Sequence, residues 1–334
     1  MAGSRALRKL QLGKEVVAAG TPVAATTIWR GQGVIKDNRE VIFPEEDVGI
    51  LGGTDRSYIA RYWSELAMPS VEATFEQIPY IFTAGVEALT TGSADTGGSG
   101  YIYTYDAPTT AQNTTTTYTI EGGDDQQAEE FDYAFVKRFN LSGDGQSALM
   151  MSADWTGRVT TNASFTGSLS IPSVEEIIVN KATLYIDNAG GTIGTTTVSN
   201  TLFGIDFDYT TGLQEYWAVD GSLDFSLTKF TTDDIVLTAT YEHNASAVSE
   251  KAKYRDGDVR LVRLKFEGSA LTTAGATYTY KTLILDMAGV YEDWSALEDQ
   301  DGNDVVTATL RVRYSETDSF KFQAVVVNEN ATLP

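Results

Sequence analysis

The sequence predicts a mainly β protein made of two tandem units of antiparallel strands, each with a short α-helix packed over a sheet. Long segments alternate apolar and polar residues, as half-buried strands do. Glycine is abundant, with 30 residues, whereas the 334-residue chain holds only 7 prolines. A similar succession of strand-like segments, one helix-like stretch and an acidic hairpin occurs in residues 1–172 and again in residues 173–334. The length also fits two domains of roughly 100 to 200 residues each.

The first helix-like stretch covers residues 75–89. Its apolar residues recur at helical spacing, so they share one face: Phe75, Ile78, Phe82, Val86 and Leu89. Pro79 is compatible with a helix only near the first turn, because proline lacks the backbone N–H and clashes with the preceding turn. The spacing therefore predicts a short helix that begins close to Pro79 and packs over a sheet.

A long hairpin follows in the first half, where strand 131–139 turns at 142–145 into strand 147–155. Residues 223–241 repeat its order of a basic residue, a phenylalanine, an acidic turn and an apolar return strand. We match the two segments as counterparts and place the domain boundary near Pro172.

The second half contains the clearest alternation. Val306, Ala308, Leu310, Val312 and Tyr314 fall on one face of a strand over 305–315, and the run 320–328 is predicted to pair with it. Further strands are predicted at 182–187, 260–267 and 278–286, with turns at Asp256-Gly257 and Asp301-Gly302. Val290, Trp294 and Leu297 predict the second short helix.

Charge and composition exclude several classes of function. The chain has no cysteine, and 46 acidic against 24 basic residues give a net charge of −22. Thiolate chemistry and disulfides are therefore absent, and the surface repels a phosphate backbone. The N-terminus lacks the apolar core of a secretion signal and no segment is apolar enough to span a membrane, so we expect synthesis in a cytoplasm and no membrane contact.

Residues able to carry catalysis are scarce. His243 is the one histidine and is expected to be an ordinary strand-end residue. Residues 299–304 are rich in oxygen ligands but depart from the calcium-loop pattern, which favours a hairpin turn. Acid pairs are too numerous to single out a glycosidase site. We expect no enzyme activity, no catalytic residue, no cofactor and no metal site.

The informative acids lie on predicted strands. Asp206 and Asp208 share a face opposite Ile205, Phe207 and Tyr209, and Asp224 and Asp132 are flanked by apolar residues in the same manner. Such a face is either functional or an ordinary solvated strand face, and both possibilities stay open. A basic arm at residues 1–20 stands apart from the acidic body and carries Arg5, Arg8, Lys9 and Lys14. The alternative to a functional arm is a frayed terminus.

Three short motifs carry a resemblance to a known family. Residues 10–15 (LQLGKE), 19–26 (AGTPVAAT) and 72–82 (EATFEQIPYIF) are similar to segments of the major tail tube proteins of long, non-contractile (siphovirus-type) bacteriophage tails. The resemblance implies β-sandwich units whose inner sheets join side by side into a β-barrel ring, with rings stacked into a tube. Members with two units per chain form trimers of pseudo-sixfold symmetry, with a hexamer as the alternative here.

The resemblance also implies a location and partners. The protein is expected in the virion tail, assembled in the bacterial host cytoplasm from copies of itself together with tape-measure, tail-terminator and tail-tip proteins. Double-stranded DNA would pass through the tube without specific binding. Asp132, Asp206, Asp208 and Asp224 are then candidates to face the lumen, and Arg5, Arg8, Lys9 and Lys14 to reach the neighbouring ring.

Two other functions stay open at this stage. One is another β-rich phage assembly protein, such as a head–tail connector or a decoration protein. The other is a carbohydrate-binding β-sandwich or a glycosidase, in which exposed aromatic residues would stack on sugars. The five tryptophans are scattered among unrelated segments, which argues against a single aromatic platform.

Overall fold

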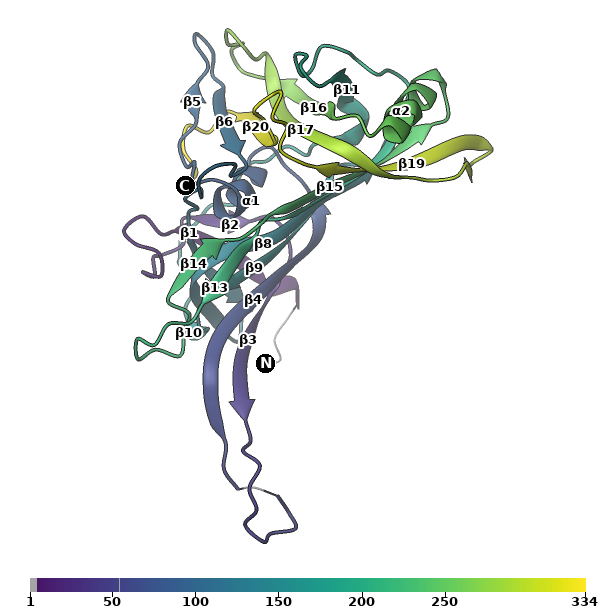
Figure 1. The fold of residues 1–334 in the computed structure, drawn as a ribbon. Helices are drawn as coiled ribbons and strands as arrows, with labels where there is room; N and C mark the ends of the chain where they lie inside the picture. Colours follow the sequence, from purple (N-terminus) through teal and green to yellow (C-terminus); the bar gives the residue numbers. More distant parts are fainter. Residues whose placement is uncertain (1–4, 54) are drawn as a thin grey trace.

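The computed structural model describes residues 5–53 and 55–334, and in this range the chain is mainly β, as predicted. One long, curved sheet dominates the fold (Figure 1). Most of the remaining strands and both α-helices lie on its upper and left side in this view. The opposite face, on the inside of the curve, is largely free of covering elements.

The long sheet joins eight strands edge to edge, and every neighbouring pair is antiparallel. In pairing order they are β3 (Val34–Ile42), β4 (Tyr58–Glu72), β9 (Met150–Gly157), β8 (Ala128–Asp144), β12 (Leu202–Thr210), β15 (Asp234–Glu242), β19 (Asn303–Val312) and β17 (Tyr280–Trp294). The pairing of β8 with β12 carries the sheet across the predicted boundary near Pro172, which stays a prediction.

β8 and β17 also take part in a second layer of strands. The N-terminal part of β8 pairs with β7 and β10, and β7 pairs with β1, which continues to β2. The N-terminal part of β17 pairs with β16 and β20; β16 continues to β11, and β20 to β6 and then β5. These strands are β1 (Lys9–Lys14), β2 (Thr27–Trp29), β5 (Ser93–Ala94), β6 (Tyr101–Asp106), β7 (Tyr118–Gly123), β10 (Thr161–Ala163), β11 (Ala182–Asn188), β16 (Arg260–Ala270) and β20 (Phe322–Asn328).

The same pairing order occurs in both halves of the chain. In the first half the order is β1, β7, β8, β9, β4 and β3, with β10 added to β8. In the second half it is β11, β16, β17, β19, β15 and β12, with β20 added to β17. A helix follows β4 in the first series and β15 in the second.

The predicted match between the hairpins at 131–155 and 223–241 is wrong. The first segment is a hairpin, β8 with β9. In the second, β14 (Leu227–Phe230) pairs with β13 (Leu213–Tyr216), while β15 pairs with β12 and β19. The counterpart of the β8–β9 hairpin by pairing order is β17 with β19. A basic residue, a phenylalanine and an acidic turn form too local a pattern to fix which strands pair.

The first predicted helix is confirmed. α1 (Ile78–Gly85) has Pro79 in its first turn, and every residue in it is buried. Because α1 is buried all round, it is a core helix and not an amphipathic surface helix.

The second predicted helix is wrong. Val290 and Trp294 belong to β17, where a bulge between Tyr291 and Asp293 inserts an extra residue. Leu297 follows β17 and is 54% exposed, Val290 is half-buried and Trp294 is buried, so the three residues do not form one buried helical face. The helix lies at α2 (Ala245–Asp256), which the Asn244 side chain caps through the backbone N–H groups of Ser246 and Ala247 at 2.9 and 3.1 Å.

The other strand predictions hold apart from one residue and one pairing. The strands at 182–187, 260–267, 278–286, 305–315 and 320–328 correspond to β11, β16, β17, β19 and β20. Val306, Ala308, Leu310 and Val312 are buried as the alternation predicts, whereas Tyr314 lies past the end of β19 and is 46% exposed. β20, however, pairs with β17 and β6 and not with β19. The segment between β19 and β20 crosses to the second layer, which alternation along a strand cannot show.

One continuous hydrophobic core spans both halves, from Leu10 to Leu333. At the junction, the ring of Phe139 on β8 lies 5.1 Å from that of Tyr209 and 6.2 Å from that of Phe207, both on β12. Phe207 in turn stacks on Phe322 of β20, with 5.5 Å between ring centroids. The junction is therefore packed like the interior of a domain.

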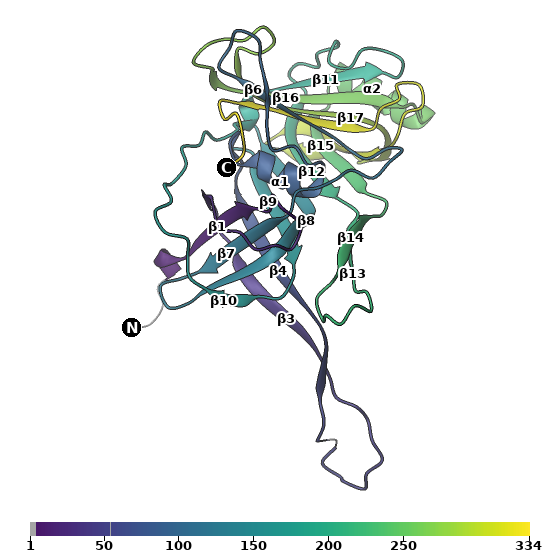
Figure 2. The ribbon, with the colours of Figure 1, turned by 90° about the vertical axis from the view of Figure 1, so that its left-hand side faces the viewer.

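Two long strand connections form arms that extend from the long sheet. The β3–β4 connection forms a long arm that reaches far below the rest of the molecule (Figure 2). It exposes several apolar side chains, among them Phe43 at 67%. The corresponding β12–β15 connection contains β13 and β14 and folds back onto the first half. Phe225 at its tip is fully buried, with its ring 4.9 Å from that of Tyr133 and 6.1 Å from that of Phe135.

We predict that Phe139→Ala strongly destabilises the protein. The side chain is 1% exposed and contacts aromatic rings from both halves, so the substitution leaves a large cavity at the junction. The expected loss is about 3–5 kcal/mol of unfolding free energy, measured by denaturant titration. Phe43→Ala, at a 67% exposed position, is the matched control and should change the stability little. Equal effects of the two variants would contradict the packing described here.

Candidate functional site: the polar face of the long sheet

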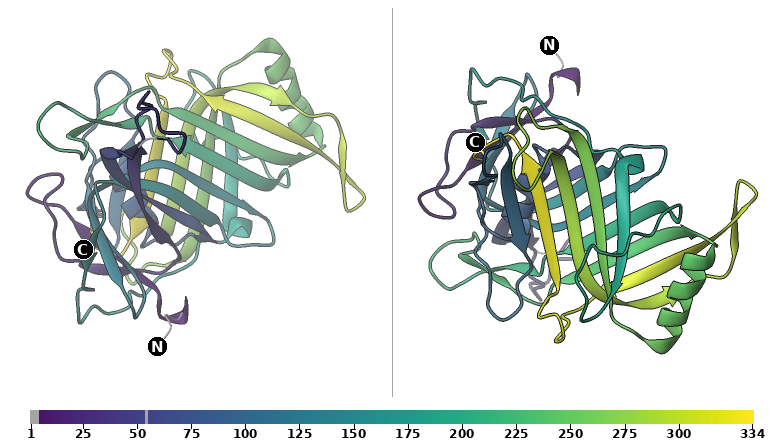
Figure 3. Two further views of the ribbon diagram at one scale, coloured as in Figure 1. Left: turned by 90° about the horizontal axis from the view of Figure 1, so that it is seen from below. Right: turned by 90° about the horizontal axis from the view of Figure 1, so that it is seen from above.

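The inner face of the long sheet carries mainly polar side chains. Figure 3 (left) views the sheet from below, with its strands running side by side across the picture. Along β12, Ile205, Phe207 and Tyr209 are buried, whereas Asp206 is exposed and Asp208 half-buried. Because side chains alternate between faces along a strand, the register between strands assigns each residue of the sheet to the core face or to the polar face.

Carboxylates outnumber cations on this face. The register and the ion pairs place on it Glu40, Glu65, Glu72, Asp144, Asp154, Asp206, Asp208, Asp234, Glu242, Glu292 and Asp293 together with Lys36, Arg61, Arg138 and Arg311. Serine, threonine and asparagine occupy most of the positions between them, including Asn140, Ser152, Thr238 and Thr309. The net charge of the face is therefore negative.

Each of these four cations is held by a carboxylate of the same face. Lys36 pairs with Glu65 at 3.4 Å and Arg61 with Glu40 at 2.5 Å. Arg138 Nε donates to both carboxylate oxygens of Asp208, at 3.0 and 2.9 Å, so this pair bridges β8 and β12 at the junction. Arg311 binds Asp234 and Glu292, which links β19 to β15 and β17.

Hydrogen bonds within these ion pairs shift the pKa values of Arg138, Arg311 and Glu65. Hydrogen bonding to Asp208 raises the pKa of Arg138, and hydrogen bonds to Glu292 and Asp234 raise the pKa of Arg311. Burial alone would raise the pKa of Glu65, but hydrogen bonds from Trp63, Asn38 and Lys36 outweigh it and leave that pKa lowered. The four cations are thus paired with neighbouring carboxylates. The net negative charge of the face comes from the remaining acids.

Asp154 and Asp206 are the clearest of these remaining acids. Both are exposed, Asp154 on β9 and Asp206 on β12. The amide of Asn140 donates to Asp206, while Asp154 lies close enough to Arg138 to help raise the pKa of that guanidinium. Asp154 was not singled out from the sequence, although its place between the buried Ala153 and Trp155 is the same signal that identified Asp206.

The structure separates the four predicted lumen acids into two groups. Asp206 and Asp208 lie together on the polar face. Asp132 lies on the N-terminal part of β8, where Tyr133 has a positive φ of 55° and the register to β7 shifts. This bulge and a second one between Val136 and Arg138 interrupt the alternation of faces along β8. The face on which Asp132 lies therefore cannot be counted along the strand from Arg138.

Asp224 lies outside any strand, in the tip between β13 and β14, and accepts a hydrogen bond from the backbone N–H of Val159 at 2.9 Å. It lines a small pocket together with Asp132 and Arg158. Arg158 stacks over the ring of Tyr133 at 4.7 Å. Asp132 and Asp224 therefore belong to the contact between the β13–β14 tip and the first half.

Asp132 has an unusual environment in this pocket. Burial and the nearby charge of Glu15 raise the pKa of Asp132 to about 6, although Arg158 opposes the shift. Glu15 is itself buried and accepts hydrogen bonds from Thr117 at 2.5 Å and from the backbone of Tyr133 at 2.8 Å.

The predicted basic arm is shorter than residues 1–20. Residues 1–4 lie outside the described residues. Lys9 and Lys14 belong to β1, a strand paired on both sides, and its Leu10 and Leu12 are buried in the core. Lys14 donates to the carbonyl of Leu333 at 3.0 Å, and burial lowers its pKa. Arg5 and Arg8 precede the strand and are exposed. Contact with a neighbouring ring stays a prediction for all four residues.

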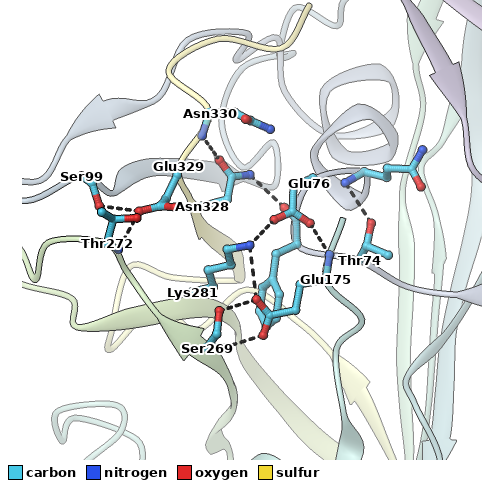
Figure 4. Close-up of polar contacts among 12 residues, drawn as sticks. Thr74, Glu76, Ser99, Glu175, Ser269, Thr272, Lys281, Asn328, Glu329 and Asn330 are labelled. Carbon is cyan, nitrogen blue, oxygen red and sulfur yellow. Dashed lines mark hydrogen bonds and ion pairs between the residues drawn. The ribbon is translucent and has the colours of Figure 1, made fainter. Parts of the chain in front are cut away.

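A second cluster of charges lies away from the polar face and ties the halves together (Figure 4). Lys281 on β17 forms ion pairs with Glu76 at 2.7 Å and Glu175 at 3.2 Å. Burial would lower the pKa of Lys281, but these two carboxylates outweigh it and raise the pKa. The backbone N–H of Glu175 also donates to Glu76 at 2.8 Å. The groups satisfy one another, as expected of a structural network.

The remaining sequence candidates have structural explanations. His243 directly follows β15, and its backbone N–H donates to the backbone carbonyl of Asp304. Residues 299–304 form a tight hairpin between β18 (Glu298–Gln300) and β19, with Asp301 and Gly302 at φ 56° and 82°. Within residues 5–53 and 55–334, no group of three or more acidic or histidine side chains is placed to hold a metal ion. No helix in that range has the length and apolar character needed to cross a membrane.

Neither protein-family models nor the sequences of curated proteins give any match to this chain.

We predict that Asp132→Asn stabilises the protein at pH 7.5 and does so clearly less at pH 4.5. The folded state binds the Asp132 proton more tightly than the unfolded state, whose pKa is near the ordinary 3.8. The penalty on folding therefore grows as the pH rises from about 3.8 to about 6 and is complete above this range, and asparagine removes it. Thermal unfolding at the two pH values measures it. A variant less stable than the wild type at pH 7.5 would show that the ionised carboxylate is needed in the fold.

Proposed function

We propose that this protein is a structural subunit of a bacteriophage tail tube, in which copies of the chain form rings and the rings stack around a channel for double-stranded DNA. The observation that carries the proposal is the curved eight-stranded sheet, whose inner face is polar and net acidic. Its outer face is covered by the core, the helices and the second layer. The motifs in residues 10–15, 19–26 and 72–82 support the same conclusion.

The recurring pairing order supports two equivalent units per chain. Each unit contributes four strands to the long sheet, and β8 of the first unit pairs with β12 of the second. Three chains joined in the same manner would close a ring of six units with pseudo-sixfold symmetry, whereas a hexamer would contain twelve. Closure removes the free strand edges that an open sheet exposes.

The size of the proposed barrel fits a channel. Three chains would supply about two dozen strands, and at roughly 4.8 Å between strands the circumference of the backbone would be at least ~115 Å. That is more strands than the 16–18-stranded porins, which already hold an aqueous channel. The polar inner face would then become the lining of the tube.

The charge of the lining suits passage of DNA without binding. DNA carries about one negative charge per 1.7 Å of its axis, and cationic groups on a protein bind it by releasing counterions. On this face Lys36, Arg61, Arg138 and Arg311 are paired with carboxylates, and Asp154 and Asp206 form no salt bridge with any residue that the structure describes. The lining would therefore repel the phosphates weakly and offer no strong site at which the DNA stalls.

The proposal places the protein in the virion tail, made in the cytoplasm of the bacterial host. Its partners would be further copies of itself and the tape-measure, tail-terminator and tail-tip proteins. No catalytic role or cofactor is proposed.

Negative-stain electron microscopy of the purified protein tests the proposal. We expect rings, or tubes of stacked rings, with a central channel that takes up stain. Rings that never stack would favour a connector, and a strict monomer at high protein concentration would contradict self-assembly. Binding of oligosaccharides by such a monomer would favour the carbohydrate-binding alternative.

Charge reversal on the lining tests the role of its acids. We expect Asp154→Lys combined with Asp206→Lys to form tubes that, assembled with short duplex DNA, protect it from nuclease at low salt and release it as the salt rises. Wild-type tubes should protect none. The control is Asp256→Lys with Glu316→Lys, two exposed acids outside the strands of the long sheet. Protection by the wild type, or equal protection by the control, would argue against an acidic lining.

A further inference from the structure

The long sheet ends in two strand edges that are free within the described part of the chain. β3 pairs with β4 on one side only. At the other end, β17 and the residues after it pair with β19, while its partners β16 and β20 stop at Gly289 and Met287. Residues 293–299 therefore have one unpaired side. Exposed edges of this kind are templates for pairing with another chain.

The junction inside the chain shows how such edges can join. β8 and β17 each carry a bulge against the next strand, between Val136 and Arg138 in β8 and between Tyr291 and Asp293 in β17. If the bulges are equivalent, Arg138 corresponds to Asp293. When the strand pairings are followed outward from the two bulges, Trp155 corresponds to Leu310, Leu66 to Leu237 and Ile35 to Phe207. All of these six side chains pack in the core, which supports the alignment.

In this alignment residues 293–299 correspond to the C-terminal part of β8, and β3 corresponds to β12. The observed register between β8 and β12 therefore predicts how residues 293–299 of one copy would pair with β3 of another. Within the chain, Arg138 lies opposite Thr210, Asn140 opposite Asp208 and Ser142 opposite Asp206. The equivalent positions are Asp293 opposite Asn38, Ser295 opposite Lys36 and Leu297 opposite Val34. We propose that residues 293–299 of one copy pair antiparallel with β3 of a second copy of this chain in this register.

Side chains at the two edges fit the proposed register independently. Val34 and Leu297 are both exposed apolar residues, at 61% and 54%, and the register brings them face to face. Lys36 comes diagonally next to Asp293, within reach of a long side chain. A shift by one residue would turn Leu297 to the opposite face from Val34 and lose both contacts.

Trp294 supplies a further argument. Its side chain is 8% exposed, and its indole N–H has no hydrogen-bond partner among the described residues. Buried indole N–H groups usually find an acceptor. Trp294 corresponds to Phe139, whose opposite residue on β12 is Tyr209. In the proposed pairing the residue opposite Trp294 is Asp37, whose carboxylate is an acceptor.

This contact is of the head-to-tail kind, because the two surfaces differ. Such contacts build a closed ring when the rotation closes and an open filament when it does not. Closure into a ring therefore rests on the proposed function, whereas the register is argued from the two strand edges alone.

Engineered cysteines test the register, because the chain has no cysteine of its own. In the full-length protein, Val34→Cys with Leu297→Cys places the two thiols opposite each other across the proposed junction. The two positions lie at opposite edges of the eight-stranded sheet, roughly 30 Å apart at about 4.8 Å per strand, so a disulfide between them must join two chains. The matched control is Val34→Cys with Ala296→Cys, one residue out of register.

After oxidation of assembled protein, we expect the first pair to give covalent dimers and trimers on non-reducing gels, and the control pair to give only monomers. Rings or tubes in the microscope without this cross-link, or with cross-linking of the control pair instead, would overturn the register and leave the tube proposal standing. Cross-linked open sheets without a channel would support the register and overturn the tube. Unassembled monomers that form no cross-link would overturn both.

A second measurement uses charge. Val34→Lys alone and Leu297→Glu alone each remove the exposed apolar contact, and we expect each to reduce the assembled fraction in sedimentation. The double variant places opposite charges across the junction and should restore it. A double variant as poor as the single ones would count against the proposed pairing.

Discussion

The pairing of β8 with β12 is the contact on which the rest of the structure depends. It joins strands from the two halves over seven residue pairs and makes one sheet of eight strands from two sets of four. Hydrogen-bonded pairing alone would leave a flexible seam. Phe139, Phe207 and Tyr209 fill the core side of this seam, and the ion pair between Arg138 and Asp208 bridges its polar side.

The two long strands β8 and β17 explain how the sheet curves and how each half closes its core. Each belongs to the second layer at its N-terminal end and to the long sheet at its C-terminal end, and each has a bulge where it meets the next strand. A bulge adds a residue and strengthens the local twist, so the strand can bend from one layer into the other. The core lies in the angle between the layers, which leaves the inner face of the long sheet to solvent.

The two strand connections at corresponding places have different environments. The β12–β15 connection buries Phe225 against Tyr133 and Phe135, and Arg61 stacks over the ring of Trp217 in the same segment at 4.7 Å. In the described part of the β3–β4 connection, Phe43 and neighbouring apolar residues are exposed instead. Exposed apolar residues gathered on one arm are typical of a surface that meets another protein. In a ring of equivalent units, both arms would have neighbours.

The sequence by itself determined the strand-rich class, α1, most strands of the second half, and the face shared by Asp206 and Asp208, because alternation and helical spacing are local properties of the chain. Tertiary structure decided which strands pair, and so the counterpart of the β8–β9 hairpin, the partner of β20 and the place of α2. It also moved Asp132 and Asp224 away from the polar face and Lys9 and Lys14 into a paired strand. Bulges in β8 and β17 interrupt the alternation of faces along each strand, and pairings such as that of β8 with β12 join residues 60 to 72 positions apart. Neither effect leaves a periodic signal in the sequence.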